Sequence, residues 1–310
     1  MSSAKFKEYS TAPMMPSTRF KWHFTTFTFL GISLLVYVTF LIVPAIMGFI
    51  YSFTSWNGLT DVVNFVGLAN YREALADRRL HNAILNSVRL AVIQTLFFNF
   101  VVMILAAAIE TSRTRVLRGT LRSLFFLPFL VSFVVISVIW TSLLSYRFGV
   151  INGLMRAIGL GFFATDWLGT PATAIYSILV INLWAFSGFY LVTYMTAMQA
   201  IPKELYESAQ IDGARWFQSF RNITFPLVAP AFAVNFIVSL AWGLGTFEPV
   251  LLMTQGGPGF ASETISYYIY WFGFMGARQG YGTAVSFLLF LATMIISVIQ
   301  VYTLGRREVE

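Results

Sequence analysis

The sequence predicts an all-α membrane protein that crosses the bilayer six times. Three observations predict this fold class: the composition, six long apolar windows, and the alternating distribution of positive charge between those windows. Of the 310 residues, 57% are hydrophobic and only 11% are charged, whereas soluble domains carry roughly 25% charged residues. A composition this apolar is typical of a chain that is embedded in lipid.

The six windows define the expected domain organisation. A transmembrane helix needs about 20 mostly apolar residues, and such windows cover residues 24–50, 83–109, 121–144, 172–198, 227–252 and 283–304. The first window is longer than the roughly 7 to 15 apolar residues of a signal peptide, and no small-residue cleavage site follows it. We therefore expect a transmembrane domain over residues 24–304, an N-terminal tail over residues 1–23 and a C-terminal tail over residues 305–310.

The basic residues predict the orientation of the spans. Thirteen of the 20 Lys and Arg residues lie in the two tails and the even connections, and six lie in the alternate connections. Basic residues favour the cytoplasmic side of a membrane, so both termini and segment 199–226 are expected to be cytoplasmic. Because the net charge of +7 is explained by this topology, it does not indicate nucleic acid. The cytoplasmic set comprises Lys5, Lys7, Arg19, Lys21, Arg113, Arg115, Arg118, Arg122, Lys203, Arg215, Arg221, Arg306 and Arg307.

The sequence lacks the residues that several classes of membrane protein need for their function. Ion-coupled transporters usually carry ionisable residues at membrane depth, whereas here Arg89, Glu110 and Glu248 fall near the ends of windows. No acid, base or metal-binding set marks an intramembrane enzyme, and the chain contains no cysteine. The nucleotide-binding pattern G-x-x-x-x-G-K-[ST] is also absent. We expect no cofactor or metal on this chain, and ATP with Mg²⁺ on partner subunits if transport is active.

Two helix faces combine aromatic and polar side chains. Helical spacing of i, i+4, i+7 or of i, i+3, i+7 places residues on one stripe of a helix. Aromatic rings beside hydrogen-bonding groups suit a sugar, but Ser, Thr and Asn also hold membrane helices together. The residues alone leave both interpretations open for Asn182, Phe186 and Phe189 in the fourth window and for Ser239, Trp242 and Thr246 in the fifth.

The cytoplasmic segment 199–226 is predicted to form two short amphipathic helices. Pro202 suits the start of a helix, and Glu204 and Glu207 complement the dipole at that end. Gly213 allows the chain to turn, with Asp212 as the expected cap of the second helix. In that second helix Trp216, Phe220 and Ile223 share one face, and Pro226 is expected to end it. Such a pair could lie on lipid or dock into another protein.

This segment resembles the "EAA" loop of permease subunits in binding-protein-dependent ABC importers. The family pattern is E-A-A, three residues, G, nine residues and I-x-L-P, and both spacings occur here. Ser208 replaces the first Ala of the pattern, and Phe225 replaces its Leu. The resemblance implies a type I ABC importer permease fold in which the loop couples to an ATPase. The implied coupling residues are Glu207, Ser208, Ala209, Asp212, Gly213, Ile223 and Pro226.

Further segments resemble the maltose-type, carbohydrate-importing branch of that family. They include "VGLANYREAL", "FGVINGLM" and "LLMTQGGPGFASETISYYIY", and the last is typical of the first of the two permease subunits. In this branch the residues at corresponding positions face a translocation cavity, which favours a substrate path over helix packing. The implied path comprises Asn182, Ala185, Phe186, Phe189, Ser239, Trp242, Gly243 and Thr246. Phe186 and Trp242 differ from the maltose permease, so the particular sugar is not implied.

The resemblance implies a permease subunit in the cytoplasmic (inner) membrane of a bacterium or archaeon. Its expected partners are a second, similar permease, two ABC ATPases, an extracytoplasmic solute-binding protein, the lipid bilayer and the sugar. The implied mechanism is alternating access driven by ATP on the partners. Alternatives are a permease for another polar solute, such as a glycerol phosphate ester, an ion-coupled transporter or channel, and a membrane-bound enzyme.

Overall fold

The computed structural model of the protein describes the backbone of residues 18–112 and 114–305 and the side chains of residues 28–112 and 114–303. The first 17 residues of the expected N-terminal tail, Arg113 and residues 306–310 lie outside the described residues. The chain divides into two compact units, Met1–Ile50 and Tyr51–Glu310.

The first unit is one long apolar helix. It consists of α1 (Thr18–Tyr37), a π-helical turn (Val38–Ile42) and the greater part of α2 (Val43–Tyr51). Residues Thr28–Tyr51 have a mean hydropathy of 2.4 and enough length to cross a membrane. None of the described side chains between residues 28 and 50 is buried within this chain. The apolar surface of this helix is therefore suited to contact lipid or other protein.

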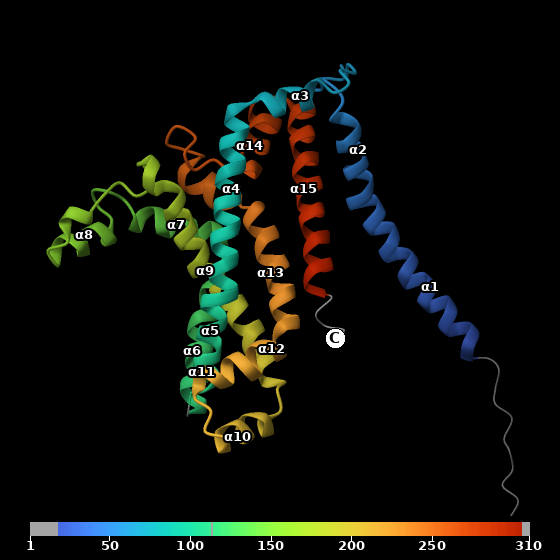
Figure 1. The fold of residues 1–310 in the computed structure, drawn as a ribbon. Helices are drawn as coiled ribbons and strands as arrows, with labels where there is room; N and C mark the ends of the chain where they lie inside the picture. Colours follow the sequence, from blue (N-terminus) through green and yellow to red (C-terminus); the bar gives the residue numbers. More distant parts are fainter. Residues whose placement is uncertain (1–17, 113, 306–310) are drawn as a thin grey trace, which may run out of the picture. The chain divides into compact units, whose positions relative to one another are not determined.

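The second unit contains the remaining helices (Figure 1). Among the described residues, the only β pairing is an isolated bridge between Thr54 and Phe65. The helices are α3 (Ala69–Ala76), α4 (Arg78–Leu96), α5 (Met103–Glu110), α6 (Arg115–Phe126), α7 (Phe133–Leu143), α8 (Val150–Ala157), α9 (Pro171–Gln199), α10 (Lys203–Ile211), α11 (Trp216–Ser219), α12 (Phe225–Leu227), α13 (Ala229–Leu244), α14 (Ile265–Tyr270) and α15 (Gln279–Gly305).

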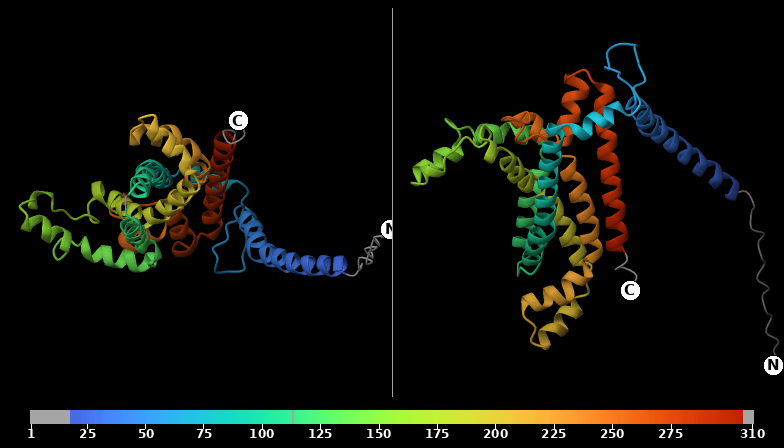
Figure 2. Two further views of the ribbon diagram at one scale, coloured as in Figure 1. Left: turned by 90° about the horizontal axis from the view of Figure 1, so that it is seen from below. Right: turned by 45° about the horizontal axis from the view of Figure 1, so that its top comes forward.

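The helices agree with the six predicted windows when bent pairs are counted as spans. Four continuous helices are long and apolar enough to cross a membrane, among them Arg78–Glu110, Pro171–Gln199 and Gln279–Thr303 of the second unit. Two bent pairs raise the number to six among the described residues. Within the second unit, α4, α13 and α15 lie side by side, and α10 and α11 lie at the end opposite to α3 and α14 (Figures 1 and 2).

The third window is bent, which its apolar composition did not predict. Helices α6 and α7 meet at an angle of 95°. A 3-10 turn with Pro128 near its start ends at Leu130, and Val131 is extended. Proline removes a backbone donor, and an extended residue interrupts the helical hydrogen bonds. Helix α9 also passes this bend closely, because a Cβ on Gly188 would lie 2.2 Å from the carbonyl oxygen of Phe125.

The fifth window is also interrupted. A helix that runs from Trp216 to Leu227 meets α13 at an angle of 72°. The helix ends at Leu227 and the break falls at Val228, so the expectation that Pro226 ends the second cytoplasmic helix is wrong by one residue. Proline fits within the first turn of a helix, and Pro226 occupies that place in α12. At the other end α13 stops at Leu244, eight residues before the predicted end of the window.

Helices α4 and α13 pack with almost no space between their backbones. A Cβ built on Gly243 would lie 2.4 Å from the Cα of Ala91. Small residues let membrane helices approach in this way. A larger apolar core joins α5, α9 and the segment after α11, and it includes Phe98, Tyr190, Tyr194 and Phe220. These two contacts position α4, α9 and α13, the helices that form the wall of a cavity.

Candidate functional site

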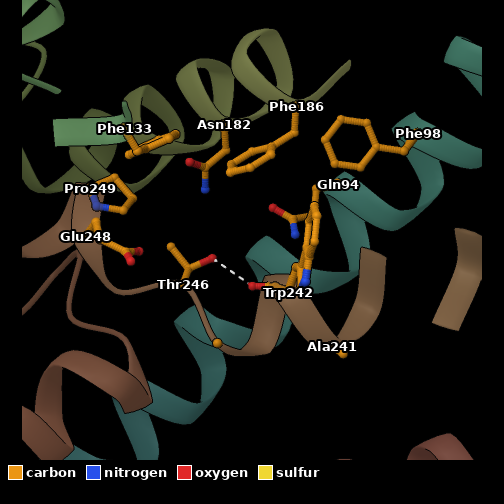
Figure 3. A pocket seen from close by; sticks show the side chains of 11 residues that line it. Gln94, Phe98, Phe133, Asn182, Phe186, Ala241, Trp242, Thr246, Glu248 and Pro249 are labelled. Atoms are coloured by element: carbon orange, nitrogen blue, oxygen red, sulfur yellow. Dashed lines mark hydrogen bonds between the residues drawn. The ribbon is translucent and has the colours of Figure 1, made fainter. Parts of the chain in front are cut away.

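A cavity of about 320 Å³ lies where α4, α9 and the end of α13 meet the start of α7 (Figure 3). In Figure 3, Asn182 and Phe186 extend from α9 towards Thr246 and Glu248, which follow the end of α13. The cavity is open, because Trp242 and Glu248 in its wall are both exposed. The described residues that line it are Gln94, Phe98, Phe133, Asn182, Phe186, Ala241, Trp242, Gly245, Thr246, Glu248 and Pro249.

Asn182 brings an amide with an unpaired oxygen to the cavity wall. Its residue is 3% exposed, and its side-chain oxygen Oδ1 has no hydrogen-bond partner. Buried polar atoms are almost always paired, and an unpaired one costs about 1 to 3 kcal/mol. Asn182 belongs to the cavity lining, and its amide nitrogen is turned towards Thr246 (Figure 3). A solute hydroxyl at this place can exchange hydrogen bonds with the amide, which both donates and accepts.

Aromatic rings form the apolar part of the wall. Phe186 stacks on Phe133 with a centroid distance of 5.5 Å and an angle of 12°, and it lies 5.6 Å from the ring of Trp242. Phe189 lies behind this group, 5.4 Å from Trp242, and does not belong to the lining. Rings beside amide and hydroxyl groups provide the mixed surface that binds a ring-shaped polar solute.

The structure divides the eight residues that resemblance assigned to a substrate path. Asn182, Phe186, Trp242 and Thr246 line the cavity. Ala185 is buried in a small core with Ile136 and Met253. Ser239 and Gly243 are buried against α4 and the turn that follows it rather than in the cavity wall.

Ser239 belongs to a polar contact between helices. Its hydroxyl accepts a hydrogen bond from Nδ2 of Asn99 at 3.0 Å, and Oδ1 of Asn99 accepts one from the hydroxyl of Tyr194 at 2.6 Å. The side chain of Ser239 is fully buried. This arrangement matches the helix-packing alternative for Ser239, and the i, i+3, i+7 stripe therefore does not face the cavity as a whole. One residue of the predicted stripe, Thr246, lies beyond the end of α13 and is not helical.

Sequence reasoning missed several residues of the wall, above all Gln94, Phe98, Phe133 and Glu248. Gln94 and Phe98 lie in the second window, where an apolar background hid their shared face. Glu248 was assigned to the end of a span, but the early end of α13 brings it into the wall. An acidic residue inside a predicted span was the signal that could have identified it.

The loop around Glu263 holds two parts of the cavity wall in place. The side chain of Glu263 is fully buried and accepts hydrogen bonds of 2.8 Å and 2.7 Å from the guanidinium of Arg79. Thr264 donates to the backbone oxygen of Thr246 at 2.7 Å, and the backbone nitrogen of Ile265 donates to Ser87 in α4. The segment that carries Thr246 and Glu248 is thereby attached to α4, which carries Gln94.

Arg79 is itself enclosed by aromatic rings. Its guanidinium carbon lies 4.0 Å from the ring centroid of Phe260 and 4.3 Å from that of Trp271. Burial raises the pKa of the Glu263 carboxyl above its ordinary value, and the hydrogen bonds and charge of Arg79 oppose this change. The glycine-rich segment 254–264 contains left-handed residues, including Gln255, Gly256 and Gly259, and its main contact is the buried ion pair.

The segment that resembles the coupling loop forms the two expected helices. Helix α10 spans Lys203–Ile211, and the second helix begins at Trp216. The expectation that Asp212 caps the second helix is wrong, because Asp212 ends α10. The N-cap is Arg215, whose backbone nitrogen donates to Oε1 of Gln218 at 2.7 Å.

One hydrogen bond that the sequence did not indicate joins the two helices. The hydroxyl groups of Tyr206 and Thr224 lie 2.9 Å apart. Phe220 and Thr224 are buried beneath α10, and Trp216 stacks on Phe220 at 5.5 Å and 11°. Phe220 also belongs to the apolar core that contains Tyr190 and Met198 of α9, so one face of the helix pair is attached to a membrane-spanning helix.

The opposite face of the helix pair is available to a partner. Glu207, Ser208, Asp212, Gly213 and Pro226 are exposed, whereas Ala209 and Ile223 are half-buried. Ile211 is 87% exposed and Phe217 is 62% exposed. Gly213 has a φ of +78°, in the left-handed region. Exposed apolar residues of this size are suited to a protein or lipid contact.

A second cavity of about 680 Å³ lies between the helix pair and the ends of α5, α6 and α9. Its polar wall includes Glu110, Arg118 and Lys203. Arg118 donates to Glu110 at 2.8 Å and to the backbone oxygen of Ser112 at 3.1 Å. Among the described residues, no group of three or more His, Asp or Glu side chains is arranged to hold a metal ion.

These features define a class of protein. A polytopic α-helical unit with an open, aromatic and polar cavity, and with a separate helix pair at one end, is a membrane transport subunit. The chain belongs to the family described as the inner membrane component of binding-protein-dependent transport systems, which residues 106–308 match.

Relatives and solved structures support this assignment over nearly the whole chain. The chain is 33% identical to a probable starch degradation products transport system permease protein of Thermoanaerobacterium thermosulfurigenes, over 91% of this chain and 94% of that protein. It is 30% identical to the trehalose/maltose transport system permease protein of Thermococcus litoralis, over 86% and 88% of the two chains. A chain of a bacterial ABC transporter that imports the acidic polysaccharide alginate superposes with a TM-score of 0.82 at 25% identity, over 93% and 97% of the two chains.

Proposed function

We propose that this chain is a carbohydrate-translocating permease subunit of an ABC importer, and that the sugar passes through the 320 Å³ cavity. The observation that carries the proposal is the unpaired Oδ1 of Asn182 in a wall of stacked aromatic rings. A sugar supplies hydroxyl donors for the amide and apolar C–H faces for the rings. The names of the relatives, which include starch degradation products and trehalose/maltose, favour the same solute class.

Energy for transport comes from partner subunits in this proposal. This chain has no nucleotide-binding pattern of its own, and the exposed face of α10 and the second helix docks into an ABC ATPase. The ATPase dimer, a second similar permease and an extracytoplasmic binding protein complete the complex. Movement of the docked helices changes the access of the cavity from one side of the membrane to the other, because Phe220 of the helix pair packs in the same apolar core as Tyr190 and Met198 of α9.

The proposed membrane orientation follows the distribution of basic residues. Both termini and the helix pair lie in the cytoplasm, whereas the Glu263 loop lies outside. This orientation places the two ends of the second unit on opposite sides of the bilayer, in agreement with the separation of α10 and α14 in Figure 1.

Uptake of a labelled sugar into proteoliposomes that contain the whole complex tests the proposed path. We expect Trp242→Ala to reduce uptake by about tenfold, because an aromatic contact with a ring-shaped ligand is worth about 1 to 3 kcal/mol. Asn182→Leu should reduce uptake to a similar extent, because a buried polar group that loses its hydrogen-bond partner costs about 1 to 3 kcal/mol. Trp242→Phe, which keeps an aromatic ring, is expected to recover most of the uptake. Trp184→Phe is the control, since Trp184 contacts Trp140 and not the cavity. Equal uptake by all four variants would rule out this cavity as the path.

A further inference from the structure

The charge of the cavity carries an inference about the class of solute. Of the described residues in the wall, Glu248 is the only one with a charged side chain. The other polar side chains of the wall are those of Gln94, Asn182 and Thr246, with the indole of Trp242. The wall therefore combines neutral hydrogen-bonding groups with one carboxylate.

No cation of the described part of the chain neutralises this carboxylate. The ion pairs there join Arg79 to Glu263, Arg118 to Glu110 and Arg278 to Glu73. Glu248 takes part in none of them, and its side chain is exposed to the open side of the cavity. In Figure 3 its carboxylate points into the space between Thr246 and Asn182. An unpaired charge in a cleft with low-dielectric walls produces a potential that acts on every solute inside it.

The position of Glu248 is fixed rather than accidental. The backbone of Thr246, two residues earlier, is held by Thr264, and the next residue, Pro249, is buried. The restrained backbone keeps the carboxylate of Glu248 within the length of its side chain of the cavity wall. A negatively charged solute in the cavity would meet repulsion from this carboxylate.

We infer that Glu248 makes the cavity repel anions and attract cations, so that the transported solute is a neutral sugar or one with an ammonium group. Uronates and phosphate esters are disfavoured. This inference rests on the proposed function and narrows it, because it separates neutral and amino sugars from a glycerol phosphate ester. It also sets this chain apart from the structurally similar importer, whose substrate is the acidic polysaccharide alginate.

A single cysteine in the cavity measures its charge without knowledge of the solute. The natural chain has no cysteine, and Ala241 is an exposed residue of the wall. The Ala241→Cys variant is assembled into the complete complex in nanodiscs, and its modification by cationic and anionic methanethiosulfonates of equal size is followed by mass spectrometry. The complex without the added cysteine gives the background from other subunits.

The ratio of the cationic to the anionic rate decides the inference. The single charge of Glu248, acting across a water-filled cavity of this size, should raise the modification rate of the cationic reagent by about two- to threefold and lower that of the anionic reagent by a similar factor. We expect Glu248→Gln to lower the ratio by about fivefold and 1 M salt to have a similar effect in the parent. Asp61→Asn is the matched control, since Asp61 is exposed and lies outside the cavity wall, and it should leave the ratio unchanged.

Two results would overturn the inference: an unchanged ratio in Glu248→Gln, or an equal decrease in Asp61→Asn. Uptake of a labelled neutral sugar by the same preparations separates this inference from the proposed function. A charge-dependent ratio without any sugar uptake would overturn the proposed path while the charge selection stands. Sugar uptake together with a ratio that does not depend on Glu248 would overturn the charge selection while the proposed path stands.

Discussion

Arg79 and Glu263 form a buried bidentate ion pair although 184 residues separate them in the sequence. The pair joins the first turn of α4 to the loop before α14, and its carboxylate has no exposed surface. Because neighbouring groups of the same loop hold Thr246 and Ser87, the ion pair belongs to the framework of the cavity and not to its lining.

Removal of one partner of this pair is expected to destabilise the protein. Arg79→Met leaves a buried carboxylate without a partner, and breaking a buried pair costs about 3 to 5 kcal/mol. Arg278→Met is the control, because Arg278 and Glu73 are 41% and 48% exposed and exposed pairs contribute about 0 to 1 kcal/mol. Unfolding in detergent, followed by intrinsic fluorescence, measures both variants. Equal losses would show that burial does not strengthen the Arg79 pair.

The contact between α4 and α13 predicts a strong effect of a single methyl group. In Gly243→Ala the new Cβ would lie 2.4 Å from the Cα of Ala91, so one helix must move, at a cost of about 1 to 3 kcal/mol. In Gly119→Ala the new Cβ meets nothing within 4 Å, and an exposed helix gains up to about 1 kcal/mol from alanine. Thermal unfolding should show opposite signs, and a Gly243→Ala variant as stable as the parent would contradict the close packing.

The backbone at Gly213 predicts which residues the coupling segment tolerates. Its φ of +78° strains most side chains, although a Cβ there meets nothing in this chain within 4 Å. Asn tolerates the left-handed region and β-branched residues do not. We expect Gly213→Val to lose co-purification of a tagged ATPase and sugar-stimulated ATP hydrolysis, whereas Gly213→Asn retains most of both. Insertion of the spans should be normal in each, and identical behaviour of the two variants would show that the turn has no part in coupling.

The proposed topology predicts the accessibility of two exposed positions. Val116, between Arg115 and Arg118, should be cytoplasmic, and Ile158, close to Arg156, should be external. Both side chains are exposed, at 80% and 68%, and their replacement preserves every basic residue. A membrane-impermeant maleimide added to intact cells should label Ile158→Cys alone. Labelling of Val116→Cys and not of Ile158→Cys would place the helix pair outside the cell. The pair could then not contact a cytoplasmic ATPase, which would contradict the coupling proposal.

Local patterns in the sequence determined much of the fold. The six apolar windows correspond to four continuous helices and two bent pairs, since the length and polarity of a segment decide whether it can cross a bilayer. The sequence from Pro202 to Pro226 likewise predicted the helix pair, because turns and amphipathic faces depend on residues that are close in the chain. These features needed no information about distant contacts.

Only the tertiary structure decided which faces meet. Helical spacing gave the same support for a place in the substrate path to Asn182, Phe186, Ser239 and Trp242. In the structure Ser239 packs against Asn99, while the other three line the cavity. Glu248 entered the wall because α13 ends at Leu244. Arg79 and Glu263 form an ion pair although 184 residues separate them in the sequence. The physical reason is that helical periodicity shows only which residues share one face of a helix. The direction in which that face points, and the residue at which the helix ends, depend on packing against segments that are remote in sequence.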